Sequence, residues 1–246
     1  MFQGLEYIPL LHARLAEIRA LEGLEQVTKQ RIFPVIRVRP WLNSKSIERA
    51  YEVVENAVGD GFYGFDLDPT KYDPNSEREA VQEFSELFSA SHGFENYYNC
   101  VASGQYRVPV FREIERPSPQ IGLQIEHASQ IGRGLIVRVP IANPGVYLQV
   151  AQQCISHGLN NTAFIFDCGW RQDALQQAGV TIGLVNSLLD LTEDFEISIA
   201  ASTFPSEFAN RGTRFTQQIS EREYFDLVRN QLTRLIHRRG LRGWRE

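Results

Sequence analysis

Three aspartates stand at the ends of segments rich in β-branched and aromatic residues. Asp66 and Asp68 lie at the end of segment 63–68, and Asp167 closes segment 162–167. Carboxylate oxygens are the hard ligands that Mg²⁺ and Mn²⁺ prefer in proteins. Asp66, Asp68 and Asp167 could therefore hold a divalent metal in a hydrolase of the phosphodiesterase or nuclease type.

Arginines occupy the ends of other segments of the same kind. The planar guanidinium group pairs with carboxylate and phosphate through two parallel hydrogen bonds. Alternation along a strand places Asp66 and Asp68 on one side, and likewise Arg37 and Arg39. The full set of candidate ligand-binding residues at the segment ends is His12, Arg37, Asp66, Asp68, Arg112, Arg138, Asp167 and Ser202.

Three interpretations of this set remain open. The aspartates could bind Mg²⁺ or Mn²⁺ for hydrolysis while the arginines hold a phosphate. The same residues could bind an anionic ligand, or a protein partner, without turning it over. They could also form arginine–aspartate pairs that fill the interior, because a buried charge must be paired. No general base stands out, so catalytic residues, cofactor and enzymatic status are left unassigned.

These residues are positioned by a repeated strand–helix pattern. Short apolar runs with strand composition occur at 7–11, 32–38, 63–68, 107–111, 134–139, 162–167 and 196–202. Stretches with apolar residues at helical spacing follow at 13–24, 46–58, 77–90, 121–131, 144–157, 172–191 and 220–235. We expect an interruption of the sixth helix near Gly179, and a long loop at 91–105 that is suited to contact a partner.

Near-continuous apolar strands that alternate with amphipathic helices indicate a parallel sheet covered by helices. Seven such units favour an α/β fold of the TIM-like (β/α) barrel type. An eighth strand is not evident, so the barrel is either incomplete or closed in another way. We expect one domain over residues 1–246. In a barrel, the strand ends would converge at one mouth, where ligands bind.

Composition indicates a protein of the cytoplasm. The chain has no run of ~18 apolar residues, so we expect no membrane span, and its start lacks the features of a secretory signal. Its three cysteines form no CxxC pair, which suits a reducing compartment. The net charge of −5 argues against nucleic-acid binding by the whole domain. A basic C-terminal segment could still contact nucleic acid or an acidic partner; it carries Arg234, His237, Arg238, Arg239, Arg242 and Arg245.

Several short blocks along nearly the whole chain resemble the beta protein family of bacteriophages and prophages, of the phage T4 type. The blocks lie at 7–11, 31–36, 135–139, 164–167 and 200–205. His12 and Arg37 depart from the family pattern, which has a lysine and an acidic residue there. The resemblance implies an origin in a phage or mobile element, with some members in anti-phage defence, and it implies no known reaction.

We therefore expect an accessory protein in phage–host conflict that binds a protein partner or an anionic ligand at the barrel mouth. The alternative is a metal-dependent phosphodiesterase or nuclease.

Overall fold

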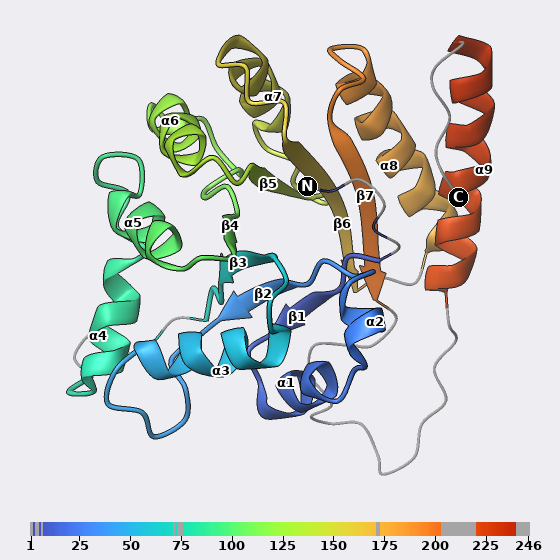
Figure 1. Cartoon of the computed structure of the whole chain (residues 1–246). Coiled ribbons are helices and arrows are strands. Elements are labelled where there is room, and N and C mark those ends of the chain that lie inside the picture. Colours follow the sequence, from blue (N-terminus) through green and yellow to red (C-terminus); the bar gives the residue numbers. More distant parts are fainter. Residues whose placement is uncertain are drawn as a thin grey trace. The chain divides into compact units, whose positions relative to one another are not determined.

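A computed structural model describes residues 2, 5, 7–70, 72, 76–170, 173–202 and 220–239, with side chains up to residue 233. Seven strands occur in this part of the chain, one in each segment predicted to form a strand (Figure 1). They are β1 (Leu10–His12), β2 (Val35–Val38), β3 (Tyr63–Leu67), β4 (Arg107–Pro109), β5 (Leu135–Pro140), β6 (Thr162–Trp170) and β7 (Glu196–Ser202).

Helices alternate with the strands, so the α/β class is confirmed. They are α1 (Leu15–Glu22), α2 (Gln26–Lys29), α3 (Glu48–Val58), α4 (Glu79–Glu86), α5 (Glu95–Ser103), α6 (Ile121–Ile131), α7 (Tyr147–Ser156), α8 (Ala174–Leu189) and α9 (Glu221–Arg239). None of the described helices is long and apolar enough to cross a membrane. Each of the seven predicted helices is present, α6 with the predicted bounds, while α2 and α5 were not predicted.

The prediction of a loop over 91–105 is wrong, because α5 occupies most of that segment. Tyr97, Tyr98 and Val101 are all buried, and they lie on one face of the helix. The residues before α5 enter it through a left-handed turn, with positive φ at His92, Gly93 and Phe94. A Cβ on Gly93 would lie 2.5 Å from the Cβ of Leu123, so the turn requires glycine there.

The predicted interruption near Gly179 is also wrong. Helix α8 runs unbroken past Gly179, which is exposed, and a Cβ there would meet no atom within 4 Å. The helix buries a face that includes Ala178, Val185 and Leu188. Burial of that face outweighs the cost of about 1 kcal/mol that a mid-helix glycine carries relative to alanine.

The strands form a four-stranded sheet in the order β1-β2-β3-β4 and a three-stranded sheet in the order β5-β6-β7. Pairing is parallel throughout the first sheet. All five residues of β3 are buried, as expected for a parallel strand covered on both faces. Neither sheet closes on itself among the described residues, so the class that the structure establishes is α/β with parallel sheets.

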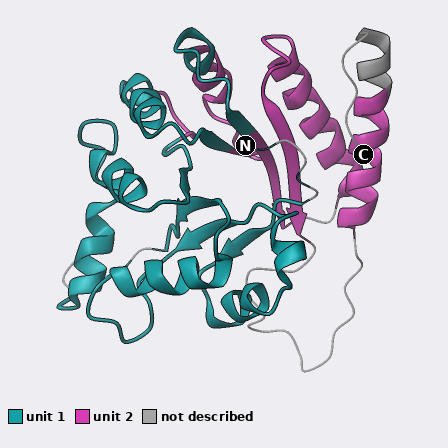
Figure 2. Cartoon of the chain, viewed as in Figure 1, with its two compact units in different colours: residues 1–113, 118–137, 153–163 teal, residues 114–117, 138–152, 164–246 magenta. Residues whose placement is uncertain are grey.

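The chain divides into two compact units, coloured separately in Figure 2. Unit 1 comprises residues 1–113, 118–137 and 153–163, and unit 2 comprises residues 114–117, 138–152 and 164–246. Unit 1 contains the whole four-stranded sheet with α1 to α6. The expectation of a single domain over 1–246 stays a prediction.

Candidate functional site

Strand register in unit 1 places three predicted site residues in one row. His12 of β1 is the partner of Arg37 in β2, and Arg37 is the partner of Asp66 in β3. Arg39 and Asp68 lie two residues further along, just beyond their strands. Neighbouring parallel strands therefore bring cationic and acidic side chains together at their carboxyl ends, as predicted for this part of the set.

Asp66 lies at the centre of this row. Its Oδ2 accepts a hydrogen bond from Arg37 Nε at 3.2 Å, and its Oδ1 accepts one from Arg112 Nη1 at 2.7 Å. Oδ1 also accepts from the backbone N–H of Leu67 at 2.8 Å. The Asp66 side chain is only 7% exposed, so two guanidinium groups compensate a buried carboxylate.

A glycine provides the space beneath Asp66. Gly64 precedes Asp66 by two residues and therefore lies on the same face of β3. A Cβ on Gly64 would lie 2.6 Å from Ile136 Cδ1 and 2.9 Å from Val35 Cγ2. The absence of a side chain lets these two residues pack under the charged row.

Arg112 is held through its backbone by a residue of α6. Gln124 is fully buried, and its Oε1 accepts from the Arg112 N–H at 2.9 Å while its Nε2 donates to the Arg112 carbonyl at 3.2 Å. The guanidinium carbon of Arg112 lies 5.4 Å from the ring centres of Phe88 and Tyr97. Gln124 fixes the main chain of Arg112, and the rings of Phe88 and Tyr97 flank its guanidinium group.

Tyr97 of α5 ties β3 to β4 directly below the charged row. Its hydroxyl donates to the Phe65 carbonyl at 2.5 Å and accepts from the Val110 N–H at 2.7 Å. Complete burial raises the pKa of Tyr97 well above its ordinary value, so the hydroxyl stays neutral and keeps its donor.

Asp68 forms the second half of the site. Its Oδ1 accepts from the Thr70 backbone N–H at 2.9 Å and from the Thr70 hydroxyl at 2.6 Å. Its Oδ2 lies 3.2 Å from His12 Nδ1. Burial by itself would raise the pKa of Asp68, but the hydrogen bonds from Thr70 and His12 outweigh it and lower that pKa below its ordinary value. Asp68 is therefore ionised at neutral pH.

Arg39 differs from the other arginines of the site. Its Nη1 lies 3.8 Å from Asp68 Oδ2, beyond hydrogen-bond distance, and its guanidinium carbon lies 6.0 Å from the Tyr72 ring centre. Its side chain is 31% exposed. Arg39 interacts electrostatically with Tyr72 and Asp68, while the hydrogen bonds that Asp68 accepts come from Thr70 and His12. We name the residues that meet here, His12, Arg37, Arg39, Asp66, Asp68 and Arg112, the unit 1 charge cluster.

The remaining predicted site residues belong to unit 2. Arg138 of β5 donates to Asp167 Oδ2 through Nε at 2.8 Å and also through Nη2. Asp167 Oδ1 accepts from the Gly169 N–H at 2.8 Å. Ser202 is the exposed last residue of β7. The predicted set of eight thus falls into five residues of the unit 1 charge cluster and three residues of unit 2, and their convergence at one mouth stays a prediction.

The predicted metal ligands do not lie in one unit. Asp66 and Asp68 belong to unit 1 and Asp167 to unit 2, so the Mg²⁺ or Mn²⁺ site considered from the sequence stays a prediction. Among the described residues, no group of three or more His, Cys, Asp or Glu side chains is placed to hold a metal ion. Asp66 and Asp68 each accept several hydrogen bonds from cationic or polar groups, and Asp167 is paired with Arg138.

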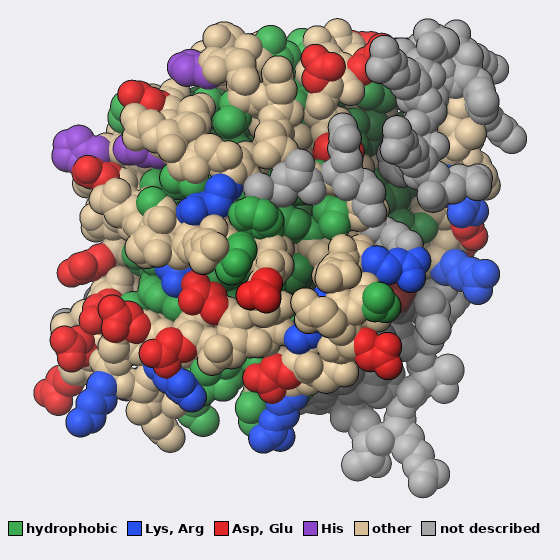
Figure 3. Space-filling view, viewed as in Figure 1, with side chains coloured by type: hydrophobic (Ala, Val, Ile, Leu, Met, Phe, Trp, Pro, Cys, Tyr) green, Lys and Arg blue, Asp and Glu red, His purple; other side chains and the backbone are tan. Residues whose placement is uncertain are grey.

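Basic side chains do not gather into a continuous surface on the face shown in Figure 3. Over the positions of α3 and α4 in unit 1, acidic side chains predominate and the Lys and Arg side chains lie singly among them. The basic C-terminal side chains predicted to contact nucleic acid or an acidic partner, Arg234 to Arg245, lie outside the described side chains.

Sequence reasoning missed two residues that hold the site together. Gln124 is a polar residue on the buried face of α6, between Ile121 and Ile125. A polar residue at a position that the helical spacing predicts to be buried is a signal that could have identified it. Tyr97 was missed because segment 91–105 was predicted to be a loop, whereas α5 occupies most of it.

Comparison with known proteins agrees with the resemblance found in the sequence. Residues 7–237 match the model of a family described as beta protein. The chain is 23% identical, over 239 residues, to "Protein beta" of Enterobacteria phage P4, where the sequence resemblance had pointed to phage T4. The match covers 94% of this chain and 63% of the P4 protein, so the chain spans under two thirds of that relative's length. No solved structure matches. Because the family model covers nearly the entire chain, this protein belongs to the beta protein family.

Proposed function

We propose that this protein is an accessory protein of phages or mobile elements that acts in phage–host conflict by binding an anionic group at the unit 1 charge cluster. The anionic group would be a phosphate or carboxylate, carried by a small molecule or by a protein partner. Family membership supports the phage association. The chemistry of the cluster supports the class of ligand.

The observation that carries the proposal is a surplus of cationic donors. Three arginines meet two aspartates here, Arg39 reaches Asp68 only at 3.8 Å, and Arg112 Nε is buried without a hydrogen-bond partner among the described residues. A guanidinium group has five N–H donors and no acceptor. The Oδ1 atoms of Asp66 and Asp68 each already accept two hydrogen bonds. An incoming anion would supply further acceptors, at a site where Arg37, Arg39 and His12 remain partly exposed.

We further infer that the two parallel sheets are parts of a TIM-like barrel. The sequential strand order within each sheet supports this, because consecutive neighbours are what a (β/α) barrel requires. A parallel bridge between Val110 and Ile136 also supports it, since it links the end of β4 to β5. In such a barrel the charge cluster would lie at the carboxyl ends of the strands, where ligands of this fold bind.

The binding proposal is tested by isothermal titration of the full chain with inorganic phosphate and then with nucleoside mono-, di- and triphosphates. We compare the wild type with Arg39→Gln, which removes a guanidinium that lies 3.8 Å from Asp68 and is 31% exposed. Arg49→Gln is the matched control, because Arg49 carries the same charge on α3 and forms only an exposed pair with Glu52.

We expect at least one phosphate compound to bind the wild type and Arg49→Gln alike, with roughly tenfold or greater weakening in Arg39→Gln, because charge-assisted hydrogen bonds contribute about 1.5–3 kcal/mol each. Equal weakening in both variants would indicate general charge attraction and contradict a site at the cluster.

The role in phage–host conflict needs a separate measurement. We would compare the plating efficiency of a panel of phages on bacteria that express the wild type, Arg39→Gln or Arg49→Gln. A change in plating that Arg39→Gln abolishes and Arg49→Gln keeps supports the role. If anion binding is intact and no phage responds, the proposed biological role fails while the binding site stands.

A further inference from the structure

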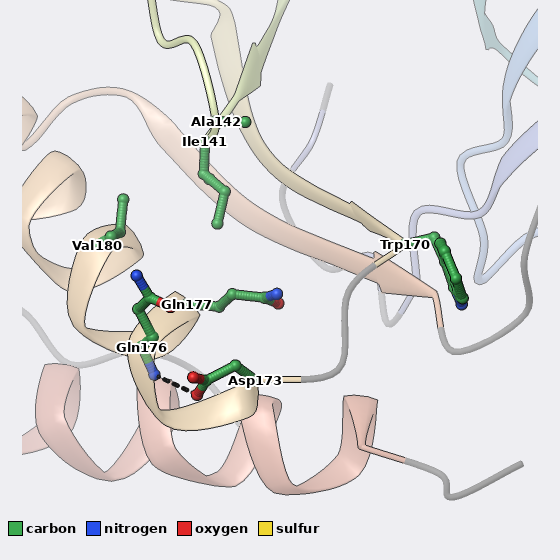
Figure 4. A pocket seen from close by; sticks show the side chains of 7 residues that line it. All are labelled: Ile141, Ala142, Trp170, Asp173, Gln176, Gln177 and Val180. Atoms are coloured by element: carbon green, nitrogen blue, oxygen red, sulfur yellow. Dashed lines mark hydrogen bonds between the residues drawn. The ribbon is translucent and has the colours of Figure 1, made fainter.

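A second candidate site lies within unit 2, on the opposite side of strand β6 from the Arg138–Asp167 pair. A cavity of about 520 Å³ opens where β5 and β6 end and α8 begins (Figure 4). Along β6, Cys168 alternates with Asp167 and so faces the other side of the sheet, while Trp170 follows Gly169, whose φ is +62°, and lines the cavity. The volume falls in the range of ~300–1,000 Å³ that is typical of small-molecule sites. In parallel α/β folds, ligands bind at the carboxyl ends of the strands, where this cavity lies.

One buried polar group points into the cavity with an unused donor. Gln177 is 8% exposed and lines the cavity. Its Oε1 accepts from the thiol of Cys168, which fixes the orientation of the carboxamide. Its Nε2 has no hydrogen-bond partner among the described residues, so it can donate to a ligand or to water in the cavity.

The first turn of α8 adds acceptors beside this donor. Asp173 caps the helix, with Oδ1 accepting from the Gln176 N–H at 3.0 Å. Asp173 Oδ2 and the Gln176 carboxamide make no hydrogen bond in the described part of unit 2, and both residues line the cavity. Figure 4 shows Asp173 and Gln177 on the helix side of the cavity, with Trp170 across from them.

The remaining walls are apolar and uncharged. Ile141 and Val180 line the cavity together with the 43%-exposed Trp170. The lining contains no Lys, Arg or His among the described residues, so it lacks the cationic groups that bind phosphate. This site therefore differs in chemistry from the unit 1 charge cluster, and its lining suits an uncharged ligand instead of the anion proposed there.

We propose that this cavity binds a neutral nucleobase of the guanine type, as a nucleoside or as one base of a nucleic acid. Trp170 would lie along the face of the ring, the Gln177 Nε2 would donate to the ring carbonyl, and the Asp173 carboxylate would accept from adjacent ring N–H groups. Single bases in proteins are held by stacking on aromatic side chains and by hydrogen bonds to their Watson–Crick edges.

Guanine is favoured over the other bases by the order of groups along its edge. It presents one carbonyl acceptor beside two N–H donors, on N1 and on the 2-amino group. A carboxylate can accept only, so Asp173 selects an edge with donors, while Gln177 Nε2 selects one with an acceptor. Adenine lacks the carbonyl, cytosine has a single N–H₂ donor, and uracil has one N–H beside its carbonyls and no amino group, so none of them satisfies both side chains equally well.

The test is isothermal titration of the full chain with guanosine, inosine, adenosine and ribose. These ligands carry no phosphate and so avoid the unit 1 charge cluster. We expect guanosine to bind most tightly, inosine about threefold to tenfold more weakly because it lacks the 2-amino donor, and ribose not to bind. Equal affinity for all three nucleosides, or binding of ribose alone, would overturn the assignment.

Two variants locate the binding in this cavity. Trp170→Ala removes the stacking ring and should weaken guanosine roughly tenfold or more. Asp173→Asn keeps a side-chain oxygen for the helix cap but loses the second acceptor. We expect this variant to bind guanosine and inosine with equal, reduced affinity, because the discrimination depends on that acceptor.

Leu175→Ala is the matched control, since Leu175 lies on the same turn of α8, is 70% exposed and does not line the cavity. Guanosine affinity should be unchanged in this variant. Thermal unfolding of each protein shows whether it is folded before its affinity is compared. Wild-type affinity in folded Trp170→Ala and Asp173→Asn would place guanosine elsewhere and refute the proposal, as would a folded wild type that binds none of the nucleosides.

Discussion

Replacing Asp66 by Asn tests whether the charge cluster depends on its central carboxylate. The Asn side chain has the same shape but no charge, and it offers one acceptor in place of two oxygens. Arg112, which is 13% exposed, and Arg37, which is 27% exposed, would then share no buried counter-charge at this position. Loss of one partner from a buried ion pair costs about 3–5 kcal/mol. Because water reaches Arg37 in part, we expect a value of about 3 kcal/mol.

The assay is urea unfolding of wild type and Asp66→Asn, with Glu52→Gln as the control. Glu52 pairs with Arg49 on the exposed surface of α3, so its loss should change the free energy of unfolding by about 0.5 kcal/mol or less. A double variant sharpens the test. Arg112→Met removes the more buried guanidinium and should cost less in the Asp66→Asn background than in the wild type.

A coupling of about 1 kcal/mol or more between these substitutions is expected, since residues in one ion-pair network are not additive. The reasoning is refuted if Asp66→Asn costs less than about 1 kcal/mol, or if the two substitutions add independently.

Three further changes test the neighbourhood of the cluster. Gln124→Leu should lower the free energy of unfolding by about 2 kcal/mol or more, measured in urea, because it leaves both backbone groups of Arg112 unpaired in a buried place; a neutral result would contradict its positioning role. Asp68 has a lowered pKa when folded, so its stabilisation is present above its unfolded pKa of about 3.9 and is lost as the pH falls through the folded value. The difference in urea midpoint between wild type and Asp68→Asn should shrink as the pH is lowered from 5 to 3, and a difference that grows over this range would contradict the assigned sign. Gly64→Ala should lower the free energy of unfolding by about 1–3 kcal/mol, because the added methyl group would crowd Ile136. An unchanged thermal midpoint would show that the side chains under Asp66 can move to accept the methyl group.

The strand positions could be predicted because their sequences carry the signal themselves. Runs such as 134–139 and 162–167 are almost entirely apolar, which is typical of parallel strands buried on both faces. Helix α6 likewise has apolar residues at helical spacing and a glycine after its end, Gly132, whose φ is +71°. In these segments local preference and tertiary packing favour the same structure.

Helix α5 could not be predicted because local preference and tertiary packing favour different structures there. Asn and Tyr have weak helix propensity, and they indicated a loop. The helix forms because Tyr97 and Tyr98 are buried against other parts of unit 1, including Phe65 and His127. The position of those partners is not encoded in the segment 91–105.

For the site, the sequence indicated which residues stand at strand ends but not which of them meet. Strand register decides that Arg37 is opposite Asp66, and a shift by one residue would turn the side chains to the other face. Nor could the sequence indicate that Thr70 would bond to Oδ1 of Asp68 while Arg39 stays 3.8 Å from Oδ2. That difference between two neighbouring arginines is what now makes one of them the better target for a binding experiment.

The division into two units has a consequence for how the chain can be handled and how it folds. The boundary passes through β5, β6 and α7, each of which contributes residues to both units. No single cut in the polypeptide can therefore release either unit intact, and a truncation at residue 137 or 163 would end within a strand. Each unit is also built from segments that are distant in sequence. Long loops must therefore close before many of the stabilising contacts can form, and such topologies fold slowly. A library of circular permutants should accordingly tolerate new termini in exposed connections and reject them along these three shared elements.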